Sequence, residues 1–376
     1  MQAAGVAAAG LSHDLYPSTH ALGFFFSASG AGLSIGALIG GRLSDITGRK
    51  RVLVASVAVF GLCSLLTSIA PDLRSLIASR FLTGLGLGGA MPTLIALAAD
   101  SSRAHRRNGS IAAAYVGMPL GGVVASLLGA RLPLDAWRVI FQVGGVVPLV
   151  VVPLMIRYLP AMEPAALDDP GAVQVRARAF HTFFAEGRAA TTLLLWAGFF
   201  LIVLTLHLML NWLPLLLMGR GLGKSQAAIA QAAFNVGGAA TGLYVGSLLD
   251  SRWKRLAIAI SAVALPVVLG LVAVSPPQPG LLFGLAFLLG GCIIAGQVMA
   301  YAVACACYDA HSRGTATGAA VAAGRVGSLV GPLVAASLLA AGRSPAQVLV
   351  GILPIVVTGA AIVGFLAWRE LTGASA

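Results

Sequence analysis

Long apolar segments alternate with short polar or charged turns along almost the whole chain. The hydrocarbon core of a membrane is ~30 Å thick, and a helix needs about 20 apolar residues to cross it. Eleven segments reach that length, at 21–41, 52–70, 75–98, 109–131, 138–158, 191–218, 226–249, 256–275, 281–304, 315–340 and 347–368. The pattern therefore predicts an all-α membrane protein with eleven complete spans and a fragment.

A dense charged turn separates the first two complete spans, and part of it recurs later. Residues 41–51 read GRLSDITGRKR, and the glycine, leucine and aspartate of this turn return at 246–250, each 205 residues later. A repeat displaced by half a chain predicts two homologous six-helix halves. We assign them to residues 1–158 and 191–376, joined by a cytoplasmic linker at 159–190 that contains prolines and mixed charges.

The amino-terminal segment is too short for a span. Residues 1–10 are apolar but supply only half of one, and they lack the basic start of a signal peptide. Subtracting the repeat offset from the start of the seventh helix, at Thr191, places its counterpart fourteen residues before Met1. We therefore expect helix one to be truncated, with Met1 an internal methionine or a boundary of the sequence.

Composition and charge agree with a membrane protein. Hydrophobic residues make up 58% of the chain and charged residues only 10%, with a mean hydropathy of +0.93. Lys and Arg of short loops gather on the cytoplasmic side. In this topology that side has sixteen: Arg42, Arg49, Lys50, Arg51, Arg103, Arg106, Arg107, Arg157, Arg176, Arg178, Arg188, Arg252, Lys254, Arg255, Arg313 and Arg369. The other side has six: Arg74, Arg131, Arg138, Arg220, Lys224 and Arg343. The net charge of +12 is thus explained by the Lys and Arg residues that orient the chain in the membrane. We therefore expect no nucleic-acid partner.

Motifs of soluble enzymes occur only inside apolar spans. Gly84, Gly86 and Gly89 spell G-x-G-x-x-G without a preceding strand, and residues 32–36 spell G-x-S-x-G without a strand-to-helix turn. Both are explained by close helix packing. The four cysteines lie in or at the ends of apolar spans: Cys63, Cys292, Cys305 and Cys307. We expect no catalytic residue, no metal site and no bound cofactor.

Two arginines lie inside predicted spans, where an unpaired charge costs several kcal/mol. Arg80 is roughly 9 Å from the outer end of its helix, and Arg325 is about 15 Å deep, at 1.5 Å per residue. For Arg80, snorkelling or interhelical packing is as good an explanation as function. Snorkelling from the midplane is difficult, so Arg325 is the stronger candidate to bind a carboxylate bidentately.

The acidic side chains do not supply an intramembrane proton carrier. All twelve map to loops or helix ends: Asp14, Asp45, Asp72, Asp100, Asp135, Glu163, Asp168, Asp169, Glu186, Asp250, Asp309 and Glu370. His207 is the one mid-span histidine, with a proton relay, substrate hydrogen bonding and simple packing all open. Asn211 and Gln297 are further polar candidates, for which interhelical hydrogen bonding is the default explanation.

The charged turn G-x-L-x-D-x-x-G-R-K resembles the loop between helices two and three of major facilitator superfamily transporters. Residues 79–97, 2–5, 211–214 and 324–327 resemble the aromatic acid:proton symporter family, most strongly its bacterial 3-(3-hydroxyphenyl)propionate transporters. The resemblance implies a major facilitator fold with proton as the coupling ion. In that family an aspartate in the pattern G-x-D-x-Q is associated with coupling. With Gln2 as the glutamine, it would stand immediately before Met1.

The resemblance also implies a gating motif at Gly41, Asp45, Gly48, Arg49 and Lys50, in which Asp45 helps to hold the cytoplasmic gate shut. A carboxylate near a helix amino terminus of the other half, with arginines nearby, makes a breakable latch. The alternative is that the arginines only set the orientation of the chain in the membrane, but this does not explain why the motif includes an aspartate. The repeat retains its own aspartate, at Asp250.

Together these features predict a multi-pass importer of a phenylpropionate-like aromatic carboxylate in the bacterial inner membrane, working as a monomer by alternating access. Arg325 would bind the carboxylate with help from Arg80, and His207, Asn211 and Gln297 would complete the site. The ring would lie against apolar walls that include Phe24, Phe25, Phe200 and Trp212. Two alternatives remain open: a proton-driven efflux antiporter, and a membrane protein that does not transport.

Overall fold

The computed structural model describes residues 2–100, 107–159, 188–249, 251–308 and 313–373. Within these residues every regular element is a helix. The first half contains α1 (Gln2–Leu15), α2 (Thr19–Thr47), α3 (Arg49–Ile69), α4 (Leu73–Asp100), α5 (Arg107–Arg131), the short 3-10 helix η2 (Asp135–Trp137) and α6 (Arg138–Tyr158). The second contains α8 (Ala189–Met218), α9 (Lys224–Leu249), α10 (Lys254–Val274), α11 (Pro279–Ala306), α12 (Arg313–Ala340), α13 (Pro345–Gly351) and α14 (Leu353–Gly373).

The all-helical membrane fold is confirmed, and the helices follow the apolar segments closely. In the described part of the chain, nine spans are long and apolar enough to cross a membrane, with α13 and α14 counted as one. The break between α13 and α14 was not expected, and it falls where Pro354 has no N–H to donate to the preceding turn. The eleven complete spans stay a prediction. Most of the expected linker lies outside the described residues.

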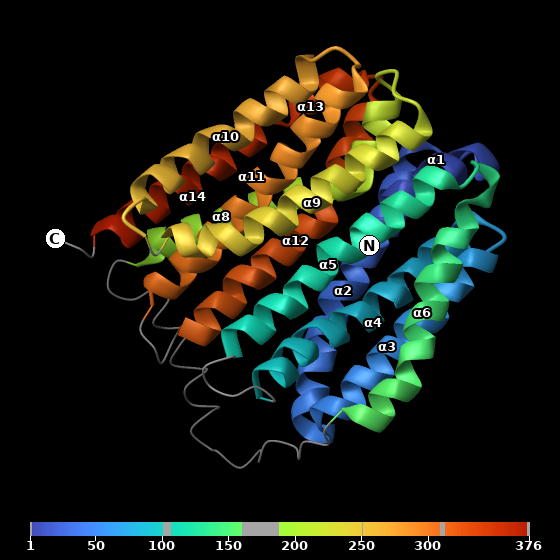
Figure 1. The fold of residues 1–376 in the computed structure, drawn as a ribbon, viewed down its shortest axis with the longest axis horizontal. Coiled ribbons are helices and arrows are strands. Elements are labelled where there is room, and N and C mark those ends of the chain that lie inside the picture. Colours follow the sequence, from blue (N-terminus) through green and yellow to red (C-terminus); the bar gives the residue numbers. More distant parts are fainter. Residues whose placement is uncertain (1, 101–106, 160–187, 250, 309–312, 374–376) are drawn as a thin grey trace.

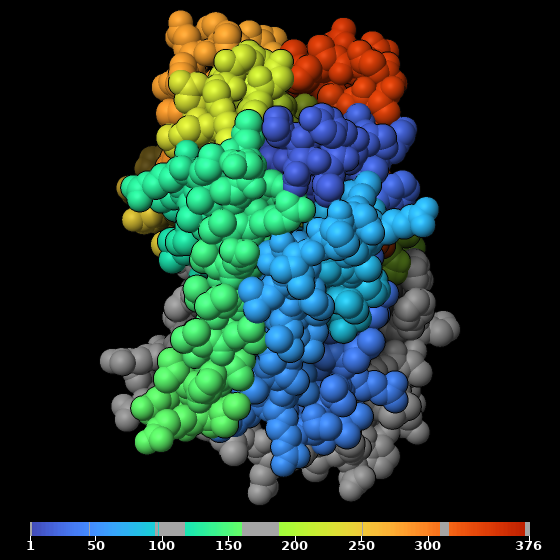
Figure 2. Space-filling model, turned by 90° about the vertical axis from the view of Figure 1, so that its right-hand side faces the viewer, coloured from blue at the N-terminus to red at the C-terminus, as the bar shows by residue number. Residues whose placement is uncertain are grey.

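The two halves repeat each other in space as well as in sequence. The helix α9 begins 205 residues after α2, and α10 begins 205 residues after α3. Within each half the equivalent pairs pack together, α2 against α4 and α9 against α11. In Figure 1 the blue-to-green helices form one bundle and the yellow-to-red helices another, running side by side. Figure 2 shows the flank of the first half, where α6 and α3 lie against each other.

In the described part of the chain the halves meet mainly where α5 packs against α9, α12 against α2, and α1 against α8, with a smaller contact of α1 with α9. The first two pairs are equivalents under the repeat. We call the end of the bundle with the 16–18, 70–72 and 219–223 turns the outer end, following the charge distribution. The described parts of α4 and α11 do not form a packed pair.

Glycines let the paired helices approach until their backbones touch. A Cβ added at Gly32 of α2 would lie 1.9 Å from the Phe81 carbonyl oxygen, and one at Gly84 of α4 would lie 2.1 Å from the Ser29 carbonyl oxygen. Gly32 and Gly36 of one motif and Gly84 of the other therefore face the packed seam between α2 and α4, whereas Gly86 packs against α3. In lipid, where apolar burial between helices adds little, such close contact is a main source of association.

The second half makes the same contacts at the equivalent positions. A Cβ added at Gly237 of α9 would lie 1.9 Å from the carbonyl oxygen of Phe287, and one at Gly290 of α11 would lie 1.9 Å from that of Phe234. Gly237 follows Gly32 by 205 residues and Gly290 follows Gly84 by 206. At these positions the α2–α4 and α9–α11 helix pairs therefore pack in the same way.

We expect Gly84→Ala to destabilise the protein by about 1–3 kcal/mol, because the added methyl must push α2 and α4 apart. The matched control is Gly270→Ala on α10, where a Cβ meets nothing within 4 Å. Thermal unfolding in detergent measures both. Equal melting temperatures for the two variants would show that the α2–α4 seam yields without cost.

Candidate functional site

Arg80 is held inside the first half by the packing of α4. It lies seven residues after the start of α4, ~10 Å along the helix. Its side chain is only 2% exposed. The neighbouring Ser79 accepts a hydrogen bond from Thr67 of α3 at 3.1 Å, which fixes the rotation of α4 at this level. Arg80 is therefore a buried cation in an apolar bundle.

The surroundings of Arg80 are aromatic. Its Cζ lies 5.9 Å from the ring centre of Phe25 on α2 and 5.6 Å from that of Phe141 on α6. Nε and Nη2 are buried without a hydrogen-bond partner. Cation–π contacts give ~0.5–2 kcal/mol each, less than the several kcal/mol needed to desolvate a cation. The guanidinium of Arg80 thus has N–H groups free to donate, and an anion bound to them would offset the remaining cost of desolvation.

In the second half, the polar candidates gather where α8 packs against α12. Arg325 of α12 is half-buried and close enough to His207 of α8 for their charges to interact. Gly327 permits this approach, since a Cβ there would lie 2.3 Å from the carbonyl oxygen of Phe200. The Arg325 carbonyl accepts a hydrogen bond from Ser328 at 2.6 Å. Arg325 and His207 therefore lie on one packed helix pair, α8 and α12.

The other sequence-predicted polar residues differ in their roles. Asn211 donates to the carbonyl of His207 at 2.7 Å, one turn back along α8, and His207 Nδ1 lies 3.0 Å from the carbonyl of Val203. These bonds within α8 satisfy part of each side chain locally. Gln297 is half-buried on α11. Arg80 lies apart from this group, since α4 and α12 are not packing neighbours.

Aromatic contacts join the halves beside these groups. Phe26 of α2 meets Trp212 of α8 edge to face, with ring centres 5.1 Å apart. The indole of Trp212 donates to the carbonyl of Pro332 on α12 at 3.0 Å, and Ser27 of α2 donates to that of Leu329 at 2.7 Å. Together these contacts connect α2, α8 and α12 across the seam.

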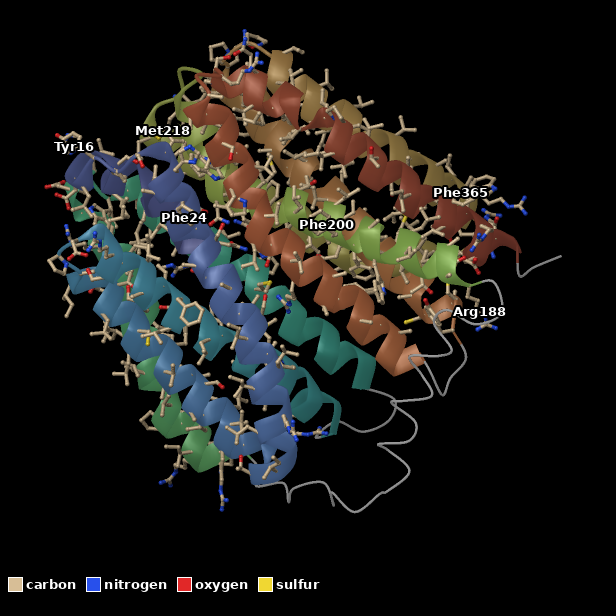
Figure 3. All side chains as sticks on the ribbon, turned by 180° about the vertical axis from the view of Figure 1, so that it is seen from behind. Tyr16, Phe24, Arg188, Phe200, Met218 and Phe365 are labelled. Carbon is tan, nitrogen blue, oxygen red and sulfur yellow. The ribbon has the colours of Figure 1, made fainter. Side chains whose placement is uncertain are left out.

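The four aromatic side chains expected to receive a ring are not equivalent. Phe25 and Trp212 are buried, Phe200 is half-buried on α8, and Phe24 is 58% exposed on α2. Figure 3 labels Phe24 and Phe200 on their helices. Of the four, Phe25 is the one in contact with a buried arginine.

The charged turn of the gating motif is a sharp helix-to-helix corner. Gly48 is the single residue between α2 and α3, and its φ of 96° lies in the left-handed region that favours glycine. Lys50 donates to the carbonyl of Leu159, at the end of α6, at 2.6 Å. Gly41 leaves open space around it, and Arg49 is half-buried. The side chain of Asp45 and the whole of Asp250 lie outside the described residues.

Sequence reasoning missed Phe141 and a set of buried amides. Gln231 of α9 is fully buried, and both polar atoms of its side chain lack a hydrogen-bond partner. Gln2 of α1 also has a buried, unpaired Oε1. A search for polar residues in apolar spans finds Gln231, whereas the contact of Phe141 with Arg80 has no signal in one sequence.

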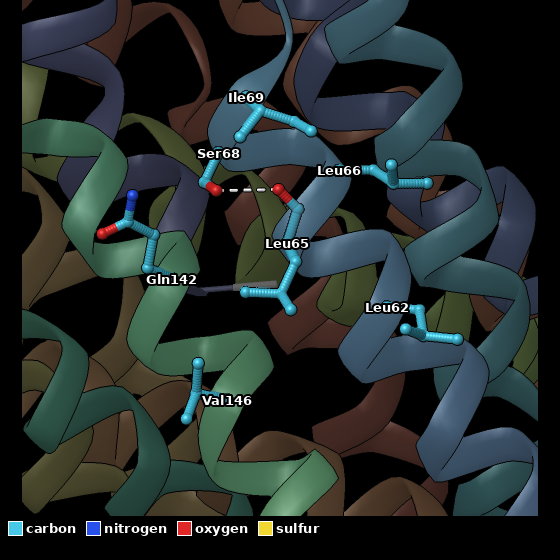
Figure 4. Close-up of a pocket in the computed structure, with 7 residues that line it drawn as sticks. All are labelled: Leu62, Leu65, Leu66, Ser68, Ile69, Gln142 and Val146. Carbon is cyan, nitrogen blue, oxygen red and sulfur yellow. Dashed lines mark hydrogen bonds between the residues drawn. The ribbon is translucent and has the colours of Figure 1, made fainter.

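A groove of about 660 Å³ lies elsewhere, between α3 and α6 (Figure 4). Its walls are mostly apolar, including Leu62, Leu66 and Val146, and Ser68 turns its hydroxyl back to the carbonyl of Leu65 at 2.7 Å. Gln142 is the remaining polar group of the wall. None of the candidate binding residues lines it, so we assign the groove to the outer flank of the bundle rather than to the site.

The outer end of the first half is tied by an ion pair. Arg138 of α6 bonds to the carboxylate of Asp14, which also accepts from Trp137 Nε1 at 3.3 Å. The Arg138 hydrogen bond holds the pKa of Asp14 below its ordinary value of 3.8. Nearby, Lys224 of α9 donates to the carbonyl of Leu132, joining the two halves.

The chain is similar to known transporters along its whole length. The Major Facilitator Superfamily model matches residues 1–332. The 3-(3-hydroxy-phenyl)propionate transporter of Escherichia coli (strain K12) is 41% identical over 364 residues, 96% of this chain and 89% of the relative. The 4-hydroxybenzoate transporter PcaK of Pseudomonas aeruginosa is 31% identical over 96% of this chain and 87% of the relative.

Solved structures agree in fold at low sequence identity. A bacterial homologue of the human lysosomal transporter Spinster, in an inward-facing, unoccupied conformation, superposes with a TM-score of 0.78 at 16% identity, covering 99% of this chain and 94% of the other. A D-xylose-proton symporter gives 0.74 at 16% identity, with coverage of 99% and 94%.

We expect Arg80→Leu to raise the stability of the ligand-free protein by roughly 1–4 kcal/mol, because it removes a buried cation that lacks a partner. Arg74→Leu, at the exposed start of the same helix, is the matched control and leaves stability unchanged. Thermal unfolding in detergent reports the difference. A lower melting temperature for Arg80→Leu would mean that the aromatic contacts outweigh desolvation.

The Asp14–Arg138 pair predicts an acid-sensitive outer end. A carboxyl whose pKa is lower in the folded state contributes stability above its unfolded pKa, near 3.8, and that contribution is lost as pH falls through the folded pKa. We expect Asp14→Asn to flatten the fall in melting temperature below about pH 4. Arg138→Gln should have the same effect, with the double variant no worse than either. If the losses of melting temperature in the two single variants add up in the double variant, Asp14 and Arg138 do not act as a pair.

Proposed function

Because the chain belongs to the major facilitator superfamily, a superfamily of membrane transporters, we propose that it imports an aromatic carboxylate together with protons across the bacterial inner membrane, acting as a monomer. The names of the relatives support the substrate class, since both curated relatives described above carry a hydroxylated aromatic acid. The observation that carries the proposal is the buried, aromatic-flanked guanidinium of Arg80 with two unpaired nitrogens.

Two cations serve the carboxylate in this proposal. A guanidinium presents parallel N–H groups that match the two oxygens of a carboxylate, and removal of water strengthens the pair. Arg325 is half-buried and meets the substrate first, beside His207, Asn211 and Gln297. Arg80 has its free donors beside Phe25 and offers both charge and an aromatic face to a ring-bearing acid.

The described contacts support one state of an alternating-access cycle. The Ser27–Leu329 and Lys224–Leu132 hydrogen bonds cross the seam between the halves, and the Lys224–Leu132 bond lies at its outer end. The proposed cycle breaks these bonds when the outer ends separate. In the other state Asp45 and Asp250 close the charged end against arginines of the opposite half.

Proton coupling needs a group that titrates as the halves move. Among the described spans His207 is such a group, and its interaction with Arg325 links its protonation to occupancy of the site. A carboxylate bound to Arg325 would favour protonated His207. In this proposal proton and substrate therefore bind together.

Uptake into proteoliposomes tests the function. With an inward proton gradient, the protein should accumulate radiolabelled 3-(3-hydroxyphenyl)propionate saturably, and collapse of the gradient should abolish accumulation. Arg325→Gln should lower uptake efficiency on the order of 10²-fold, since it removes one partner of a desolvated charge pair. The control is Arg343→Gln, at an exposed outer turn.

Three outcomes would count against the proposal. No saturable uptake of any aromatic acid rejects the substrate class, and flux only in the outward direction favours an antiporter. Equal uptake by the Arg325→Gln and Arg343→Gln variants removes Arg325 from the site.

A further inference from the structure

Gln231 is a fully buried polar side chain that the proposed site does not use. It has no exposed surface, and neither its Oε1 nor its Nε2 has a hydrogen-bond partner. Asn235 lies one turn further along the same face of α9, and its Nδ2 donates to the carbonyl of Gln231 at 3.0 Å. Buried amide groups in folded proteins are nearly always paired, so two free atoms on one residue require an explanation.

Further polar groups meet these amides where α1, α5 and α9 come together. A Cβ added at Gly122 of α5 would lie 1.2 Å from Gln2 Oε1 and 2.8 Å from Asn235 Nδ2. The two polar atoms therefore share the space that this glycine leaves open, no more than 4.0 Å apart. Ser126, one turn further along α5, has a buried hydroxyl without a partner. We call Gln2, Ser126, Gln231 and Asn235 the amide cluster.

The repeat shows that the fold does not require polar residues here. The contacts at Gly32 and Gly237 set the register of α2 against α9 at 205 residues. In that register Phe26 is the counterpart of Gln231, and Gly30 is the counterpart of Asn235. The same backbone geometry thus accepts an apolar side chain in the first half. Amides in the second half serve something other than helix packing.

The chemistry of the amide cluster selects a neutral ligand group. Its side chains donate and accept, and in the described part of the chain no hydrogen bond or ion pair links them to a charged side chain. A carboxylate needs donors and positive charge, whereas a hydroxyl can donate to a glutamine oxygen and accept from an amide N–H. We propose that the amide cluster binds a hydroxyl group on the aromatic ring of the transported acid.

This inference rests on the proposed function and adds a specificity determinant to it. The arginines hold the charged end of the substrate, and the amide cluster, where the two halves meet, recognises the far end. A site whose buried polar atoms pair with a substrate hydroxyl discriminates against the analogue that lacks it, because those atoms are then left unpaired. The protein should therefore prefer a hydroxylated ring over an unsubstituted one.

Competing uptake of two acids in the same proteoliposomes tests the inference. The probes are 3-(3-hydroxyphenyl)propionate and 3-phenylpropionate, and the readout is the ratio of their uptake efficiencies, which is independent of how much protein is active. We expect a ratio of about tenfold or more in the wild type. Gln231→Leu, of similar size, should bring it near one by lowering uptake of the hydroxylated acid alone.

Gln142→Leu is the matched control, since this glutamine is exposed on α6 and should leave the ratio unchanged. If Gln231→Leu does not yield folded protein, the same uptake ratio is measured in Gln2→Leu, which should also bring it near one. A wild-type ratio near one, or an unchanged ratio in Gln231→Leu, overturns the inference while leaving aromatic acid transport intact. Uptake of neither acid by the wild type rejects the proposed function as well.

Discussion

Backbone contact between paired helices is the constraint on which the rest of this structure depends. Water does not drive helices together inside a bilayer, so association depends on close packing and on polar contacts. At Gly32 and Gly84 the α2 and α4 backbones leave no room for a methyl group, and Gly237 and Gly290 repeat this in the second half. These rigid seams fix the rotation of each helix, and so decide which side chains face the bundle interior.

Rigid seams also explain how a cation can be kept without a partner. The α2–α4 seam places Phe25 beside Arg80, and α6 adds Phe141 on another side. A flexible site would relax until the guanidinium reached water or a carboxylate. Here the packing holds it in place, with donors already desolvated and oriented. The cost is stability in the ligand-free state, and the gain is an anion site that needs little reorganisation when an acid binds.

The sequence predicts helix positions well because a helix that crosses the bilayer needs a minimum number of consecutive apolar residues, and these can be counted directly along the chain. It also singles out Arg80 and Arg325, since charge inside a span is rare. It does not reveal that Arg80 faces Phe141, or that Gln2 and Asn235 converge over Gly122, because these contacts join helices far apart in the chain. His207 and Asn211 show the opposite case: they are conspicuous in the sequence, yet each bonds within its own helix.

The repeat separates structural residues from functional ones without an alignment of relatives. The two halves share glycines at two of the closest backbone contacts, Gly32 with Gly237 and Gly84 with Gly290. Where equivalent positions differ in polarity, the fold has no preference and another cause must act. In the register set by Gly84 and Gly290, the counterpart of Arg80 is the buried Ala286, as Phe26 is that of Gln231. Arg80 lies in the first half and Gln231 in the second, so a substrate that contacts both side chains must lie across the seam.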